Sequence, residues 1–154
     1  EYTMTRPYTF SHPGYRNALN FTNNGVPLGD QTIPNSINYG LKFNWFPNSR
    51  FESELRLNYL QHGRNSTDDN GNLVENFGGD IHHSYTYFTP KSQGMLEEER
   101  ASVFSAGIKL RYRYSYHLLF EYFGNLNSTD FRGGTQNTIF TGFSMNYAPF
   151  GEKF

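Results

Sequence analysis

Residues 36–45 read Ser-Ile-Asn-Tyr-Gly-Leu-Lys-Phe-Asn-Trp, and every second one carries a large apolar side chain. The apolar residues occupy the odd-numbered positions from 37 to 45, whereas the positions between them hold polar residues or glycine. Successive side chains of a β-strand point to opposite faces of the sheet. The stretch therefore predicts a strand with one apolar and one polar face.

The sequence that follows predicts the partner of this strand. Turn-forming residues of the Pro-Asn-Ser type occupy 46–50, and an alternating stretch resumes directly after them. Residues opposite each other in an antiparallel pair share a face, so the apolar pattern fixes the register. Setting Trp45 opposite Phe51 matches the apolar residues and also places Lys42 opposite Glu54, which adds an ion pair on the polar face.

A second hairpin is predicted over residues 104–122, with a short turn at 115–117. The register that keeps its apolar residues opposite one another sets Arg111 opposite Glu121. Two further strands are expected near the ends of the chain, at 2–10 and 137–147. The sequence thus predicts an all-β, antiparallel fold with about six strands.

The predicted connections alternate between short and long. The short ones lie near 46–50 and 115–117, and the long ones near 11–35, 63–99 and 125–136. Bacterial outer-membrane β-barrels have short periplasmic turns and longer extracellular loops. Since about eight strands are needed to close such a barrel, residues 1–154 are expected to form the carboxyl-terminal part of one larger transmembrane barrel domain.

The composition agrees with a membrane barrel. Aromatic residues make up 18% of the chain, yet the mean hydropathy is −0.72. This balance is typical of barrel strands, in which alternate residues meet lipid and the rest face a polar interior. A soluble β-sandwich or a lipocalin-like barrel is the alternative. The many aromatic residues near the predicted strand ends favour a membrane, where aromatic rings collect at both interfaces.

Several classes of function are disfavoured by the sequence. The formal net charge is −1, so no basic field indicates a nucleic-acid partner. The chain has no cysteine, which excludes disulfides and thiolate chemistry. No apolar run approaches the roughly 20 residues of a transmembrane helix. The first residues have no signal-peptide pattern, and they read as a strand of a longer chain.

The predicted polar face carries a ladder of charged residues of both signs. Its members are Lys42, Glu52, Glu54, Arg56, Lys109, Arg111, Arg113 and Glu121. Such a ladder is expected to line the lumen as a polar network, and binding of anionic sugars or an ion path is the functional alternative. Two glutamates two positions apart on a strand have the spacing of a glycosidase pair. The neighbouring cations would keep both ionised, so the chain is predicted not to be an enzyme.

One loop resembles a calcium site. Residues 68–72 read Asp-Asp-Asn-Gly-Asn, and Asp68, Asn70 and Asn72 supply oxygen atoms at alternate positions. The bidentate glutamate of a calcium-binding loop is missing at the required spacing, and the same residues are common in turns. The loop is therefore expected to be a turn, with calcium as the alternative and no other cofactor predicted.

Four short stretches carry a resemblance to a known group of proteins. They are 1–3 (Glu-Tyr-Thr), 6–12 (Arg-Pro-Tyr-Thr-Phe-Ser-His), 24–29 (Asn-Gly-Val-Pro-Leu-Gly) and 76–81 (Asn-Phe-Gly-Gly-Asp-Ile). They resemble the gliding-motility protein RemB and its relatives in Bacteroidetes, a group similar to the Wzi-type capsule-assembly barrels. The chain departs from that pattern at 33–36, where Ile-Pro-Asn-Ser replaces a Gly-Ala/Pro-Asn/Asp element.

The resemblance implies a non-enzymatic barrel in the outer membrane, concerned with surface polysaccharide (capsule) or with gliding-associated assembly at the cell surface. Its expected partners are outer-membrane lipid and lipopolysaccharide, surface polysaccharide and other outer-membrane proteins. Two alternatives remain open. One is a solute channel or porin, and the other is an accessory subunit of a larger outer-membrane secretion or uptake complex.

Overall fold

The fold was analysed in a computed structural model of the chain. It describes residues 1–9, 22–23, 26–27, 33–68, 70–80, 94–96, 99–131 and 134–148. Every regular element in these ranges is a β-strand, which confirms the all-β prediction. No helix within the described ranges is long and apolar enough to cross a membrane.

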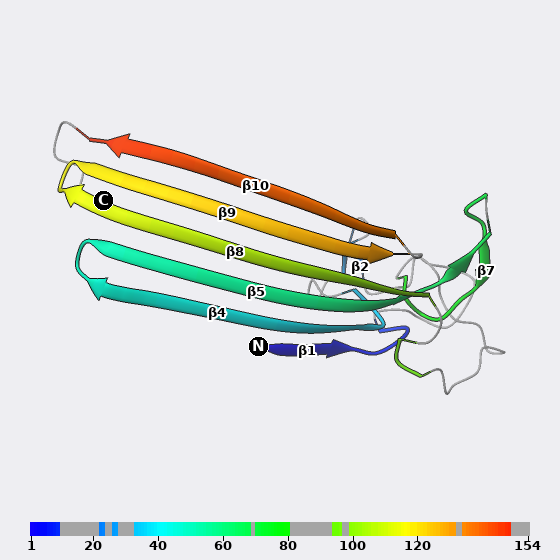
Figure 1. Cartoon of the computed structure of the whole chain (residues 1–154). Helices are drawn as coiled ribbons and strands as arrows, with labels where there is room; N and C mark the ends of the chain where they lie inside the picture. Colours follow the sequence, from blue (N-terminus) through cyan, green and yellow to red (C-terminus); the bar gives the residue numbers. More distant parts are fainter. Residues whose placement is uncertain are drawn as a thin grey trace. The chain divides into compact units, whose positions relative to one another are not determined.

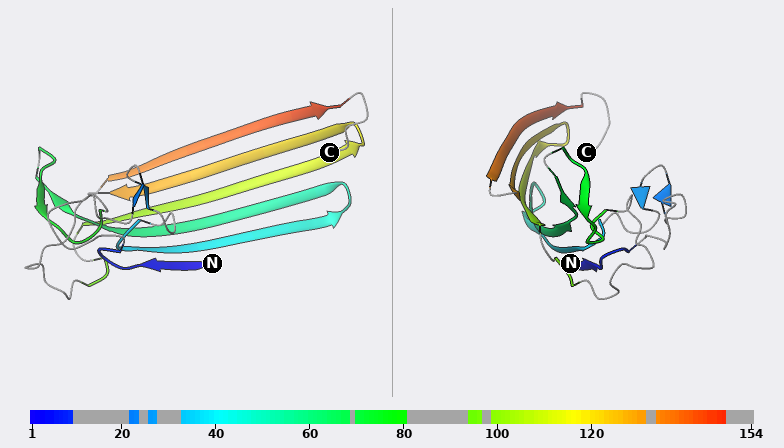
Figure 2. Two further views of the ribbon diagram at one scale, coloured as in Figure 1. Left: turned by 180° about the vertical axis from the view of Figure 1, so that it is seen from behind. Right: turned by 90° about the vertical axis from the view of Figure 1, so that its right-hand side faces the viewer.

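The main sheet contains six strands in the described part of the chain (Figure 1). In spatial order these are β1 (Tyr2–Thr5), β4 (Ser36–Asn48), β5 (Phe51–Arg64), β8 (Glu99–Ser115), β9 (Leu118–Phe131) and β10 (Gly134–Tyr147). The order follows the chain, with each strand antiparallel to the next. Figure 2 shows the strands from two further directions. Within the described residues β1 and β10 are the edges of the sheet, which is not closed.

Two small antiparallel pairs accompany the sheet. β2 (Thr22–Asn23) pairs with β3 (Val26–Pro27), and β6 (Ser66–Thr67) pairs with β7 (Leu73–Glu75). The second pair lies inside the stretch 63–99 that was expected to be one long loop. Most of the loop expected at 11–35 lies outside the described residues.

The predicted connections need three corrections. The turns at 46–50 and 115–117 are tighter than expected, because strand structure continues to Asn48 and to Ser115. The stretch at 63–99 begins and ends in strand. The long loop expected at 125–136 is wrong, since β9 extends to Phe131 and β10 begins at Gly134. The polar residues of 125–131 favour turns when taken alone, but β9 has a hydrogen-bonded neighbour on each side, and such context overrides propensity.

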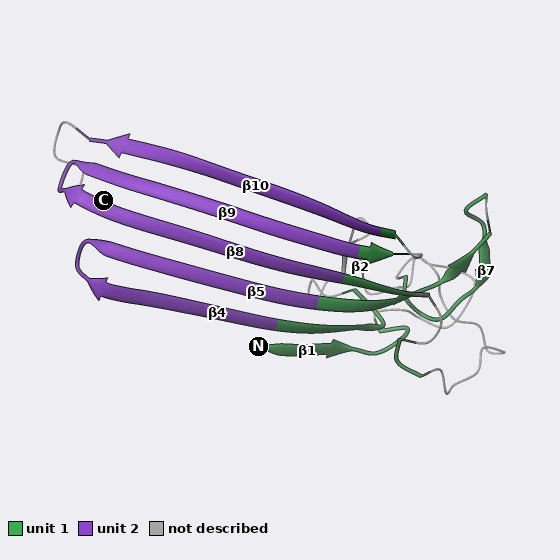
Figure 3. Cartoon of the chain, viewed as in Figure 1, with its two compact units in different colours: residues 1–39, 60–102, 130–134 green, residues 40–59, 103–129, 135–154 purple. Residues whose placement is uncertain are grey.

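The chain divides into two compact units, coloured separately in Figure 3. Unit 1 comprises residues 1–39, 60–102 and 130–134, and unit 2 comprises residues 40–59, 103–129 and 135–154. The five long strands contribute residues to both units.

Unit 2 has two chemically different faces, as predicted. On one face Leu41 and Phe143 are 59% and 66% exposed. A methyl group built on Gly124 would touch the methyl carbons of Ile108 and Thr141, so this face is continuous across three strands. On the opposite face the atom nearest to a methyl group built on Gly107 would be Oδ1 of Asn125, at 2.8 Å.

The predicted pairing of β4 with β5 is supported by ring contacts in unit 2. The rings of Trp45 and Phe51 meet edge to face with centroids 6.1 Å apart. In a second strand pair, β9 and β10, the ring of Phe123 covers Gly142, where an added Cβ would lie 2.3 Å from the ring. Its ring also lies 5.6 Å from that of Phe140.

Unit 1 is organised around a buried asparagine. Asn35 is fully buried with a φ of +53°, a conformation that asparagine adopts more readily than most residues. Its side-chain amide donates to the carbonyl of Gly63 over 3.1 Å, and its Oδ1 accepts from the N–H of Leu96 over 2.9 Å. Its own N–H donates to the carbonyl of Arg6 over 3.2 Å. One side chain thus joins segments that are far apart in the sequence.

The glycine-rich stretch 76–80 packs closely around this asparagine. Gly79 leaves no room for a side chain, since an added Cβ would lie 2.1 Å from the carbonyl oxygen of Gly63. Tyr8 donates from its N–H to the carbonyl of Gly78 and from its hydroxyl to the carbonyl of Asn76. Tyr8 from one of the stretches that carry the resemblance therefore contacts Asn76 and Gly78 from another.

We expect Asn35→Ala to lower the free energy of unfolding by at least about 2 kcal/mol, because buried partners of its side chain lose their hydrogen bonds. Asn35→Gly should cost nearly as much, although glycine tolerates the positive φ. Asn44→Ala, at an exposed position of β4, is the control and should change little. Urea unfolding of the purified chains measures the difference, and equal stability of all variants would contradict the role given to Asn35.

Candidate functional site

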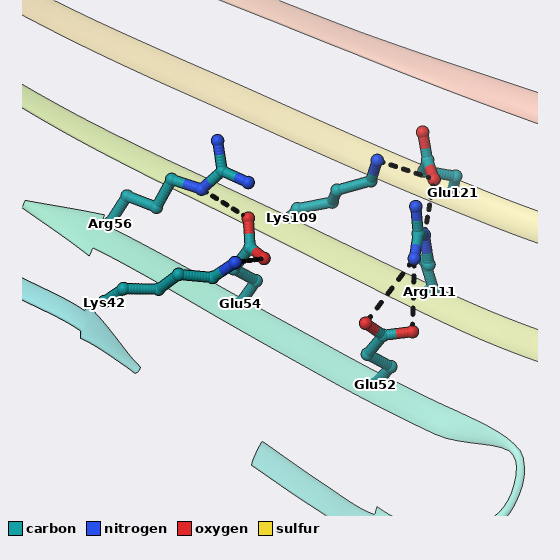
Figure 4. A network of polar contacts seen from close by, with 7 residues as sticks. All are labelled: Lys42, Glu52, Glu54, Arg56, Lys109, Arg111 and Glu121. Atoms are coloured by element: carbon teal, nitrogen blue, oxygen red, sulfur yellow. Dashed lines mark hydrogen bonds and ion pairs between the residues drawn. The ribbon is translucent and has the colours of Figure 1, made fainter. Parts of the chain in front are cut away.

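The charged residues of unit 2 gather on its polar face (Figure 4). Seven side chains from four strands point toward one another there: Lys42 from β4, Glu52, Glu54 and Arg56 from β5, Lys109 and Arg111 from β8, and Glu121 from β9. Strand alternation places them on one face, because each stands an even number of positions from its charged neighbours on the same strand.

Glu54 is the centre of the first cluster. Its Oε2 lies 3.0 Å from Lys42 Nζ, and its Oε1 lies 2.6 Å from Arg56 Nε. The glutamate side chain is only 15% exposed, whereas both cations are largely open to solvent. The ion pair predicted between Lys42 and Glu54 is therefore present. Each such exposed ion pair contributes roughly 0–1 kcal/mol.

Glu121 is the centre of the second cluster. Its Oε2 accepts from Arg111 Nε over 2.8 Å, which is the second predicted ion pair, and it lies 3.2 Å from Lys109 Nζ. The same arginine reaches Glu52, with Nη1 3.3 Å from Oε2. Arg111 thus joins carboxylates from β5 and β9 across β8.

Arg113 was predicted to belong to the same ladder, and the structure gives it a different environment. Among the described residues its guanidinium has no carboxylate partner, and its Nε is buried without a hydrogen bond. Its N–H donates to the carbonyl of Arg50 over 2.7 Å. Arg50 lies in the turn before β5, and the sequence-based reasoning did not single it out.

Two open pockets lie along the polar face of unit 2. The larger has a volume of about 720 Å³, and its charged lining residues are Arg50, Glu52, Arg111, Arg113 and Glu121. The second, of about 290 Å³, lies beside Glu54, Arg56 and Lys109. The face therefore offers space for small polar ligands beside its charged groups.

Glu52 and Glu54 of β5 have the sequence spacing of a glycosidase pair. Glu52 contacts Arg111, and Glu54 contacts Lys42 and Arg56, so each carboxylate is already engaged in an ion pair. This arrangement suits recognition and solvation of a polar lumen better than proton transfer. That the chain is not an enzyme stays a prediction.

The loop proposed for calcium forms a hydrogen-bonded turn between β6 and β7. Asp68 Oδ1 accepts from the N–H groups of Asn70 and Asn72 over 3.0 and 2.7 Å, and its Oδ2 accepts from the Asn72 side chain over 3.0 Å. Asp69 lies outside the described residues. The carboxylate thus serves as the acceptor of the turn. Within the described residues no cluster of three acidic or histidine side chains is placed to hold a metal.

The turn should respond to acid through Asp68. Hydrogen bonds from the Asn72 side chain and backbone hold the pKa of this carboxylate below its usual value. Its contribution to the turn is therefore complete above the pKa of the unfolded chain, near 3.9, and is lost as the pH falls through the lower folded value.

Amide exchange at Asn72, compared with the exchange of exposed amides elsewhere, should lose its protection over that pH range in the wild-type chain. In Asp68→Asn the protection should show no such transition, because the side chain no longer titrates. NMR exchange measurements between pH 5 and pH 2 (roughly the titration range of an aspartate) test this. A wild-type profile identical to that of the variant would contradict the assignment.

No protein-family model, curated protein or solved structure matches the chain. The resemblance to the RemB and Wzi-type group thus rests on the four short stretches alone and stays a prediction. The site is defined by its own geometry, which combines a charged face, two pockets and an opposite apolar face within unit 2.

Proposed function

We propose that the chain forms part of the wall of a bacterial outer-membrane β-barrel that handles surface polysaccharide or takes part in gliding-associated surface assembly, without catalysing a reaction. The observation that carries the membrane proposal is the separation of side chains in unit 2. Its described residues include nine charged side chains, and all of them lie on the polar face or in the turn at Arg50.

The opposite face supports contact with lipid. It exposes large apolar side chains on several strands, among them Phe43 of β4 and Ile139 and Met145 of β10, and it carries no charge in the described part of unit 2. A soluble monomer rarely exposes a continuous apolar surface of this kind, because the surface would be covered by a partner or would aggregate. A hydrocarbon layer covers such a face without any specific partner.

Strand length supports the same proposal. The five long strands contain 13, 14, 17, 14 and 14 residues. A tilted transmembrane strand needs about 9–11 residues, so each strand is long enough to span a membrane and project beyond it. Strands of soluble proteins are usually shorter, with about 5–6 residues as the commonest length.

The link to surface polysaccharide or gliding rests on the sequence resemblance. The polar face is compatible with it, since charged and amide side chains bind hydroxyl and carboxylate groups of sugars. Binding of the organism's own capsular polysaccharide to the purified protein tests this part. Absence of binding would leave the membrane proposal standing and remove the polysaccharide role.

A solute channel is the second candidate, and one observation favours it. The described part of unit 2 carries six cations and three carboxylates, so its polar face has an excess of positive charge that would attract anions. Conductance in a planar bilayer distinguishes the two functions, because a channel passes current and a plugged assembly barrel does not. Co-purification with a fixed set of outer-membrane proteins would instead support an accessory subunit.

The assignment of faces predicts opposite effects for one substitution at two positions of β4. Leu41→Arg places a charge on the apolar face and should cost about 2–4 kcal/mol if it lies near the middle of the bilayer. Asn44→Arg places the same charge on the polar face and should cost little. Unfolding of the protein from lipid vesicles by denaturant measures both, and equal costs would contradict the proposal.

A further inference from the structure

Two arginines of unit 2, Arg50 and Arg113, line the same pocket. The N–H of Arg113 in β8 donates to the carbonyl of Arg50 over 2.7 Å, which joins β8 to the turn before β5. Both side chains line the pocket of about 720 Å³. Among the described residues neither guanidinium has an ion-pair partner.

The carboxylates nearest to the pair are already engaged. Glu121 binds Arg111 and Lys109, and Glu52 binds Arg111. The lining thus holds three arginines against two glutamates, which leaves an excess of one positive charge, and neither glutamate forms an ion pair with Arg50 or Arg113. A partly buried cation beside a second cation raises the electrostatic free energy of the site, and the Nε of Arg113 also lacks a hydrogen-bond acceptor.

We infer that this pocket binds a small oxyanion, either a phosphate group or the carboxylate of an acidic sugar. Guanidinium groups match the planar, paired oxygen atoms of both, and a bound oxyanion would supply the acceptor that Arg113 Nε lacks. Arg111 also lines the pocket, but its charge is already paired with Glu52 and Glu121. The inference rests on the side chains of unit 2 alone and holds whether or not the sheet spans a membrane.

The inference is tested first by calorimetry on the purified full chain in a non-ionic detergent and a low-salt buffer. Inorganic phosphate and glucuronate are the two anionic probes, and glucose is the neutral control. Binding of either anion but not of glucose supports an oxyanion site. The anion that binds more tightly shows whether the site prefers a phosphate group or the carboxylate of an acidic sugar. Equal or absent heats for all three overturn the inference.

Two variants and a matched control locate the site. Arg113→Gln and Arg50→Gln should each weaken anion binding by about tenfold or more, as expected for the loss of a charge-assisted hydrogen bond. Arg56→Gln removes the same charge from the same face outside this pocket, and it should change affinity less than threefold, roughly a general electrostatic effect. If Arg56→Gln weakens binding as much as the other two, the effect is general charge and the inference fails.

A measurement on the unmodified chain guards against misfolding of the variants. Phenylglyoxal reacts with accessible arginine side chains, and mass spectrometry reports the extent at each position. Saturating phosphate or glucuronate should slow the modification of Arg50 and Arg113 by roughly threefold or more, because the bound oxyanion occupies their guanidinium groups. The modification of Arg56 should be unchanged. Equal protection at all three positions, or none, would overturn the inference.

Discussion

The two-residue period of the β-strand is the constraint on which the rest of the structure depends. A strand shifted by one residue against its neighbour would move its apolar side chains to the polar face and its charges to the apolar face. In unit 2 the two ion pairs Lys42–Glu54 and Arg111–Glu121 form because both partners lie on the same, polar face. Each pair is weak, but a shifted register would lose the ion pairs and bury charges against apolar groups at the same time.

The same period explains how much of the fold could be predicted. Alternation and opposite charges sufficed to pair residues from four strands, because both signals are local and repeat along each strand. The extent of β9 and β10 could not be read in this way. The residues of 125–131 look like a loop in isolation, and they are strand because hydrogen bonds to two neighbours outweigh their turn propensity. The role of Asn35 could not be predicted from local sequence for a related reason, since its hydrogen-bond partners lie up to 61 residues away.

The candidate site shows where prediction from sequence ends. Alternation placed Arg113 on the polar face together with its charged neighbours, but it could not show which cations the carboxylates bind. The ion-pair partners depend on how far each side chain extends across β8. There Arg111 forms ion pairs with both Glu52 and Glu121. Arg50 was missed because turn residues have no face that alternation can assign, and only the hydrogen bond from Arg113 places it at the pocket.

The weakness of the ion pairs bears on what stabilises unit 2. Its charges lie on an open face in high dielectric, where even the whole network contributes only a few kcal/mol by a rough count of about 0–1 per pair. Ring contacts such as Trp45–Phe51 leave both partners partly exposed. The apolar surface of this unit would therefore stabilise it only when a further layer removes that surface from water. A lipid layer covers it uniformly and leaves the charged face in water, which is why the membrane proposal accounts for both faces with one environment.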